Sequence, residues 1–298
     1  MKNLIIIEAP SNLGLKELIP NKEPGVRKLP DWLKVRGLYE KLSPKLVIRV
    51  EPPEYSMQID EVSQVRNADR IINYSKTLSD EIYKAVKSDQ FPFVIGGDCS
   101  ILIGCAPGLR AAGRYGLFFI DGHTDFILPA LSLTKGAAGM DLAIVTGNGP
   151  HKLTNIKNLK PYFSENNVVA FGNRYLNNDY VNTILNSSIT YYDLTAVRKT
   201  GIENLVKQFL EDIIDKKLDG FWIHLDVDVL DDKEMPCVDS RQSGGLTYDE
   251  LTLTFSLLLQ SPMAKGIDIT ILDPDLDPDG IYTDRFIEQF IESISVFL

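Results

Sequence analysis

Short apolar runs alternate with longer amphipathic stretches along most of the chain. Residues 65–89 and 202–218 place apolar side chains at helical spacing. Thr247 stands three residues before Glu250, a capping-box pattern that predicts a helix over 247–261. Eight runs rich in Val, Ile and Phe, each followed by a polar or glycine-containing turn, are predicted strands: 3–10, 45–50, 91–98, 115–123, 166–173, 188–193, 220–228 and 264–274.

These alternating elements predict the fold class. Strands that are almost continuously apolar and alternate with helices are typical of a mainly parallel sheet with helices on both faces. We therefore expect an α/β protein with three α/β/α layers and a sheet of about eight strands. The length alone would allow two domains. No internal repeat or linker-like stretch divides the 298 residues, so we expect a single domain over residues 1–298.

Charge and composition exclude several classes of protein. The net charge of −10 argues against nucleic acid and anionic membrane as partners. No stretch approaches the roughly 20 apolar residues of a membrane helix, and the apolar run before Glu8 is too short for a signal-peptide core. Cys99, Cys105 and Cys237 are an odd number without a CxxC pair, so we expect no disulfide framework and a cytoplasmic location.

Three of the predicted strands end in acidic or sulfur-bearing residues. In a parallel sheet, the carboxyl ends of the strands meet at one edge, where loops lead into helices and active sites lie. The residues are Asp98 and Cys99 after the third run, Asp121 after the fourth, and Asp226 and Asp228 after the seventh. We expect them to lie close together.

Two of these segments repeat potential metal ligands at every second position. Asp121, His123 and Asp125 share that spacing, as do Asp226 and Asp228. Side chains spaced in this way along an extended segment point to one side, so each set should converge. Buried carboxylates repel one another, and bound divalent cations relieve that repulsion. Carboxylates with one imidazole suit Mn²⁺, and this many anionic oxygens predicts two ions per chain with shared carboxylates.

Four motifs, in their order along the chain, resemble those of the arginase/agmatinase/formiminoglutamase family, the ureohydrolases. They are GGDCS at 96–100, DGHTD at 121–125, HLDVDVLDD at 224–232 and GGLTYDE at 244–250. The resemblance runs from APSNLGL at 9–15 to GIDITILDP at 266–274. It implies a three-layer α/β/α enzyme with a dinuclear manganese site, which hydrolyses C–N bonds of small guanidino or amidino substrates. Relatives are often trimers or hexamers, so a homo-oligomer is expected.

The resemblance also implies a role for each residue of the metal site. Asp121 and Asp226 would bridge the two ions. Asp125 would bind one ion and hydrogen-bond a bridging hydroxide, which makes it the expected catalytic residue. His123 and Asp228 would hold the other ion. The hydroxide would then attack the electrophilic carbon of the substrate.

Cys99 departs from the family pattern, because the usual motif is GGDHS and its histidine is a metal ligand. Two interpretations remain open. Cys99 is either a small buried cysteine that binds no metal or a thiolate ligand. A soft thiolate matches Mn²⁺ poorly and would favour zinc, iron, cobalt or nickel in that half of the site. In both cases one ion should bind more weakly than in a standard arginase.

Three further departures affect the substrate. Ala138 stands where family members carry a histidine that helps to protonate the leaving amine, and Ile271 stands where they carry a glutamate that grips the guanidinium. DFI at 125–127 lacks the asparagine that contacts the amino-acid end of arginine. Ordinary L-arginine hydrolysis is therefore not expected. A substrate with a better leaving group, such as an N-hydroxyguanidine or an activated amidine, depends less on the missing proton donor.

Several polar residues are weaker candidates. Ser132 and Thr134 stand where relatives contact the substrate carboxylate, and Asp141 follows the altered loop, so all three are candidate substrate contacts. Asp273, Asp275, Asp277 and Asp279 are read either as further recognition groups or as an acidic turn that caps a helix. His151 is expected at the surface. His224 is expected to orient a neighbour rather than bind metal, and Arg174 has no readable role.

Two classes of function remain in competition. The first is a hydrolase of guanidines or amidines that uses hydroxide between two metal ions. The second is a catalytically impaired relative that binds metal or a small ligand and acts through assembly or regulation. The complete carboxylate set favours the first, since those charges destabilise the fold without metal. A phosphatase-like enzyme with two metals uses similar ligands, but the order of the motifs argues against it.

Overall fold

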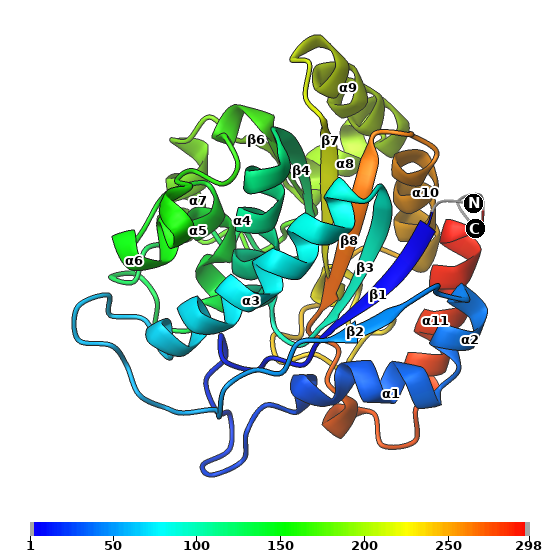
Figure 1. The fold of residues 1–298 in the computed structure, drawn as a ribbon. Coiled ribbons are helices and arrows are strands. Elements are labelled where there is room, and N and C mark those ends of the chain that lie inside the picture. The colour runs from blue at the N-terminus through cyan, green and yellow to red at the C-terminus, as the bar shows by residue number, and fades with distance from the viewer. Residues whose placement is uncertain (1–2, 296–298) are drawn as a thin grey trace.

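The computed structural model describes residues 3–295, and a single parallel sheet forms their centre (Figure 1). Its strand order is β2-β1-β3-β8-β7-β4-β5-β6, and every neighbouring pair is parallel. The strands are β1 (Asn3–Ala9), β2 (Val47–Arg49), β3 (Gln90–Gly96), β4 (Tyr115–Ile120), β5 (Val168–Phe171), β6 (Thr190–Tyr192), β7 (Gly220–Asp226) and β8 (Ala264–Thr270). Each predicted run overlaps one of them, and β3 begins one residue before its run, so the predicted sheet is confirmed. The ends of the expected domain, residues 1–2 and 296–298, lie outside the described residues.

Helices cover both faces of the sheet and complete the predicted three layers. One face carries α3 (Ala68–Lys87), α4 (Leu102–Ala112), α5 (Asp141–Val145), α6 (His151–Thr154) and α7 (Asn178–Leu185). The other carries α1 (Leu29–Val35), α2 (Leu38–Leu42), α8 (Leu194–Thr200), α9 (Ile202–Asp215), α10 (Tyr248–Leu259) and α11 (Ile281–Ile294). Within residues 3–295, none of these helices has the length and apolar character needed to cross a bilayer.

The alternation of strand side chains builds the two cores. On β1, Ile5 and Ile7 belong to the core under α3, whereas Leu4 and Ile6 belong to the core under α1 and α2. The stripe of α3 that meets the first core has the expected helical spacing and consists of Ile71, Tyr74, Leu78 and Ile82. Each fully buried aliphatic side chain of this kind stabilises the fold by about 1.5–3 kcal/mol.

The three predicted helices are present, and the predicted cap is formed. Thr247 Oγ1 accepts a hydrogen bond from the Glu250 amide at 3.2 Å, and Glu250 Oε2 accepts one from the Thr247 amide at 2.9 Å. This capping box starts α10. Helix α4 was not predicted, because all residues from Leu102 to Leu109 are buried and no polar face marks the helical period.

The acidic turn at residues 273–279 has a structural role. Asp273 accepts hydrogen bonds from the backbone amides of Gly25 and Asp275 at 3.0 and 2.8 Å. Asp277 accepts from both the amide and the hydroxyl of Thr283 near the start of α11, at 2.8 and 2.6 Å. These contacts agree with the capping interpretation of the turn.

Candidate metal centre and cavity

The carboxyl ends of four adjacent strands, β3, β8, β7 and β4, bring the candidate ligands together. Ligand atoms of Asp121, His123 and Asp125 all lie within 4.8 Å of one another, and so do those of Asp121, Asp226 and Asp228. Asp121 is completely buried, and the other three carboxylates are at most 8% exposed. The expected convergence of both motifs is therefore present.

The expected reason for this convergence was wrong, because neither motif is an extended segment. β4 ends at Ile120 and β7 ends at Asp226, while Asp228 lies in a 3₁₀ turn, η6 (Val227–Val229). Asp125 adopts a left-handed backbone with φ of 41°. Turns rather than strand alternation therefore aim the side chains.

Two aspartates organise these turns through their own backbone. Asp121 Oδ1 accepts a hydrogen bond from the amide of His123 at 2.6 Å, and Asp226 Oδ1 accepts one from the amide of Asp228 at 2.7 Å. Such bonds to the amide two residues on are characteristic of aspartate at turns. The first aspartate of each motif thus fixes the position of the residue two places later.

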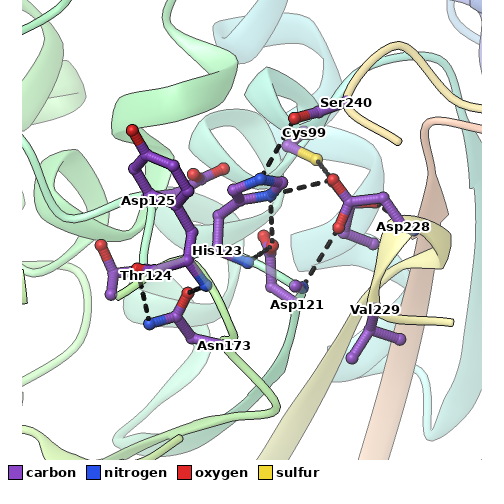
Figure 2. A network of polar contacts seen from close by, with 12 residues as sticks. Cys99, Asp121, His123, Thr124, Asp125, Asn173, Asp228, Val229 and Ser240 are labelled. Atoms are coloured by element: carbon purple, nitrogen blue, oxygen red, sulfur yellow. Dashed lines mark hydrogen bonds and ion pairs between the residues drawn. The ribbon is translucent and has the colours of Figure 1, made fainter. Parts of the chain in front are cut away.

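His123 lies between the two motifs. Its Nδ1 is 2.9 Å from Asp228 Oδ2 and 3.6 Å from Asp121 Oδ1, and its Nε2 is 3.1 Å from the hydroxyl of Ser240 (Figure 2). Burial lowers the pKa of His123, but the carboxylates of Asp228 and Asp121 outweigh it and raise that pKa well above its usual value. The imidazole is therefore held by negative charge on its Nδ1 side.

Tyr180 holds Asp125 in its unusual conformation. The Tyr180 hydroxyl accepts hydrogen bonds from the amides of Thr124 and Asp125 at 3.1 and 3.0 Å, and it donates to Asp125 Oδ1 at 3.1 Å. Aspartate tolerates the left-handed region better than most residues. Tyr180 comes from α7, far from the motif, and no local sequence signal identified it.

The sequence suggested no role for Arg174, and the structure shows one. Its guanidinium donates to the backbone carbonyls of Asp228, Val229 and Leu230 at 2.7–3.3 Å and to that of Gln242 at 3.0 Å. It therefore ties the turn that carries Asp228 to the following loop.

Gly122 allows the side chains of Asp228 and Arg174 to approach the backbone of the DGHTD motif closely. Its amide donates to Asp228 Oδ1 at 3.1 Å. A Cβ at position 122 would lie 2.4 Å from Arg174 Nη1 and 2.8 Å from Asp228 Oδ1. The close approach of these groups explains why the second residue of DGHTD is glycine.

Cys99 is buried beside the Asp226 carboxylate. Its Sγ donates to Asp226 Oδ2 at 2.9 Å and lies 3.1 Å from Thr270 Oγ1. Burial and the surrounding carboxylates raise the pKa of the thiol well above its usual value. Asp98, in contrast, accepts from Ser11 Oγ and from the Ser100 amide, so it caps a turn instead of entering the cluster.

The cluster carries an unfavourable concentration of negative charge. Burial first, and neighbouring carboxylates second, raise the pKa values of Asp121, Asp125 and Asp226. Asp228 is the exception, because His123 and Arg174 outweigh its burial and lower its pKa. Asp121 Oδ2 is buried without a hydrogen-bond partner. These oxygens and the imidazole form a donor set that suits divalent cations with hard or borderline character.

A cavity of about 390 Å³ opens above the cluster. Cys99, His123, Asp125, Asp226 and Asp228 form its floor. The lining of its walls includes Leu15, Glu17, Leu18, Thr134, Ala138, Asp239, Ser240 and Ile271. The two altered family positions, 138 and 271, therefore face the same space as the metal motifs. Asp239 and Ser240 were not identified from the sequence.

Ile271 is held in a strained conformation at this wall. Its φ is 77°, in the left-handed region that a β-branched residue rarely adopts. Its amide donates to the Gly97 carbonyl at 2.8 Å, which keeps the backbone in place. Such conformations cost on the order of 1–3 kcal/mol and concentrate at ligand sites.

Of the three residues expected to contact the substrate, one lines the cavity and two do not. Thr134 lines the cavity, whereas Ser132 and Asp141 are not among its lining residues. Ser132 Oγ accepts from the Lys135 amide at 2.9 Å and so shapes the loop. Asp141 is completely buried, and its Oδ2 lies 3.8 Å from His224 Nε2. Burial and the neighbouring Asp125 raise the pKa of Asp141 well above its usual value.

Comparisons with known proteins agree with the fold and the motifs. The family model "Arginase family" matches residues 6–296. The arginase of Staphylococcus aureus (strain MRSA252) is 29% identical over 306 aligned residues, which cover 99% of this chain and 97% of that protein. The arginase of Bacillus subtilis (strain 168) is 26% identical, covering 98% and 97%. The solved arginase of Bacillus caldovelox superposes with a TM-score of 0.87 at 25% identity, covering 100% and 98%. With the motifs, the sheet and these matches in agreement, this chain belongs to the arginase family.

Proposed function

We propose that this protein is a metal-dependent hydrolase of C–N bonds in a small guanidino or amidino compound. The observation that carries the proposal is the convergence of Asp121, His123, Asp125, Asp226 and Asp228 on the floor of a cavity. Membership of the arginase family supports the reaction type. The net charge of −10 suits a cationic substrate of this class.

The proposed cofactor is Mn²⁺, with two ions per chain and one of the two sites weaker or taken by another divalent ion. Asp121 and Asp226 would be shared between them, with His123 and Asp228 on one ion and Asp125 on the other. When bound, such ions supply a shared water of lowered pKa and polarise the group that it attacks. The donor set, four buried carboxylates and one imidazole, supports this assignment.

Asp125 is the proposed proton carrier. Tyr180 holds its Oδ1, so Oδ2 is the oxygen left to take a proton from water and return it to the leaving nitrogen. Ala138, with only a methyl side chain at the wall of the cavity, cannot act as a second proton donor.

The residues that line the walls of the cavity favour a substrate other than L-arginine. Ala138 and Ile271 are apolar where a proton donor and a guanidinium-binding carboxylate are expected. Glu17 and Asp239 are the carboxylates that remain along the walls. We therefore propose a compound whose leaving nitrogen needs little help from an acid, such as an N-hydroxyguanidine that releases hydroxylamine, a weaker base than an alkylamine, or an activated amidine.

A substrate panel tests the proposal. The protein is loaded separately with manganese, cobalt, nickel and zinc and given matched pairs of a guanidine and its N-hydroxy derivative, with release of urea, hydroxyurea and hydroxylamine as the readout. Turnover should be faster on the N-hydroxy member of each pair and should be lost in Asp125→Asn. Two bound ions per chain without turnover on any pair would instead favour a metal- or ligand-binding regulatory protein. The homo-oligomer and the cytoplasmic location remain predictions.

A further inference from the structure

His224 lies inside the protein, next to the floor of the cavity. It belongs to β7, two residues before Asp226, and it is completely buried. Its Nδ1 is 2.5 Å from Asp268 Oδ2, whereas its Nε2 has no hydrogen-bond partner. A buried imidazole nitrogen without a partner requires a physical explanation.

The surroundings of His224 fix its ring and its tautomer. His224 and Asp268 are direct neighbours across β7 and β8. Asp268 Oδ1 also accepts from the indole of Trp222 at 2.5 Å, which fixes the carboxylate. The Phe119 ring stacks on the imidazole with centroids 4.6 Å apart. In a neutral imidazole whose Nδ1 donates to this carboxylate, Nε2 presents a lone pair, which is the usual arrangement of a metal-binding histidine.

Other potential metal ligands lie near the imidazole of His224. A ring nitrogen of His224, the Sγ of Cys99 and a carboxylate oxygen of Asp121 all lie within 4.8 Å of one another. Asp121 Oδ2 and Asp141 Oδ2 are also buried without partners. At 3.8 Å, the distance from His224 Nε2 to Asp141 Oδ2 is too long for a hydrogen bond between them. Three orphaned polar atoms thus share one small region.

We propose that His224 is a metal ligand and that it forms, with Cys99 and Asp121, a site for a borderline cation such as Zn²⁺ or Co²⁺. Thiolate, imidazole and carboxylate are the donors that such ions prefer. The ion displaces the thiol proton of Cys99, which leaves to solvent, and a sulfur–metal bond replaces the sulfur–hydrogen bond. The imidazole absent from position 99, after β3, is thus supplied from β7, on the far side of β8. This revises the expectation that His224 only orients a neighbour.

The inference rests on the proposed metal-dependent function but can fail separately from it. The two halves of the centre would differ, one rich in oxygen ligands around His123 and Asp228, the other with sulfur and the nitrogen of His224. Cobalt distinguishes them, because a thiolate on Co²⁺ gives a charge-transfer absorption in the near ultraviolet.

The test measures metal content and cobalt absorption of the full chain, without reference to turnover. Wild type should bind two ions and show the thiolate band. His224→Asn should lose one ion or weaken its binding at least about tenfold, and Cys99→Ser should lose the band. His151→Asn is the matched control, since His151 is exposed, and it should behave as wild type. Two ions bound with unchanged affinity in His224→Asn would overturn the inference and leave the proposed function standing, whereas a wild type that binds no ion would overturn both.

A second measurement covers the case in which His224→Asn does not fold. The chain has three histidines, so a His123→Asn, His151→Asn double variant retains only His224. X-ray absorption of this variant loaded with one equivalent of zinc should show imidazole and sulfur scattering, with the nitrogen at about 2.1 Å and the sulfur at about 2.3 Å. A spectrum with oxygen ligands alone would overturn the inference.

Discussion

The thiol of Cys99 donates a hydrogen bond to the carboxylate of Asp226 at 2.9 Å. The residue that breaks the family motif therefore contacts a proposed metal ligand directly. That Cys99 itself binds an ion is a prediction. Replacing Cys99 should affect metal binding in any case, because it changes the surroundings of the Asp226 carboxylate.

Cys99→His should raise the occupancy of Mn²⁺. An imidazole matches this ion better than a thiol does, because manganese prefers nitrogen and oxygen donors. Equilibrium dialysis with metal analysis measures the effect, and Cys105→Ala provides the control, since Cys105 is buried in α4 outside the cluster. Identical manganese titrations for wild type and Cys99→His would contradict the prediction.

Asp226→Asn should stabilise the metal-free protein and abolish its stabilisation by metal. The substitution removes one of several carboxylates that raise each other's pKa, so the repulsion in the fold decreases. Each kcal/mol relieved raises Tm by roughly 1.6 °C for a chain of 298 residues, because the unfolding entropy is about 2.1 cal/mol/K per residue. Thermal unfolding with chelator and with added Mn²⁺ measures both effects. An unchanged metal-induced shift of Tm would argue against Asp226 as a ligand.

The stability of the metal-free protein should fall as pH rises. Asp121, Asp125, Asp141 and Asp226 have raised pKa values in the folded state, so above about pH 4 the unfolded state releases their protons first. His123 acts in the same direction, since the stabilisation from its raised pKa is complete below about pH 6.5 and is lost above. Asp228, with a lowered pKa, opposes this trend only at acidic pH.

This dependence is measured as the difference in Tm between Asp226→Asn and wild type, both with chelator. The difference should grow from about pH 5 to about pH 8. Comparing the two proteins cancels the titration of groups elsewhere in the chain. With saturating Mn²⁺, stabilisation of wild type should instead increase with pH, since the ligands must lose their protons to bind. A difference that stays constant over this range would be inconsistent with coupled ionisation in the cluster.

Arg174→Ala should weaken metal binding although Arg174 contacts no ion. Its guanidinium fixes the carbonyls around Asp228, and loss of groups that orient ligands typically lowers metal affinity about 10–100-fold. Arg36→Ala is the matched control, because Arg36 donates to the carbonyl of Gly280 far from the cluster. Affinities measured by calorimetry should separate the two variants. Equal affinities would mean that the turn keeps its shape without Arg174.

Tyr180→Phe should reduce turnover and also stability. Two backbone amides and Asp125 Oδ1 lose their common partner, and unsatisfied buried groups cost about 1–3 kcal/mol. Tyr175→Phe is the control, since Tyr175 packs edge-on against Tyr180 at 5.1 Å but no contact of its hydroxyl holds the motif. We expect the kcat of Tyr180→Phe to fall more than its metal content. Wild-type kcat in this variant would show that Asp125 needs no such support.

Features coded in short windows of sequence were predicted, and features that depend on register between distant segments were not. Apolar runs located the strands, and the spacing of Asp121, His123 and Asp125 located the cluster. Tyr180 meets Asp125 across 55 positions, and Arg174 meets Asp228 across 54. Neither pair leaves a local pattern, so only the folded chain brings them together.

The same distinction explains why the sequence alone did not indicate His224 as a metal ligand. Its spacing before Asp226 shows only that it lies on the same side of a strand. Its pairing with Asp268 depends on the register of β7 against β8, which no property of the single chain segment specifies. The sequence did not predict helix α4 for a different reason. The helix is buried on all sides, so its sequence lacks the alternation of apolar and polar faces that marks an amphipathic helix.

The walls and the floor of the cavity come from separate stretches of the polypeptide. Leu15 and Leu18 follow β1, Ala138 precedes α5 and Ile271 follows β8, whereas the acidic floor follows β4 and β7. Substitutions in the first group would change which molecules fit and would leave the carboxylates of the second group in place. A few loop replacements could thus exchange one substrate for another while the reactive groups stay the same.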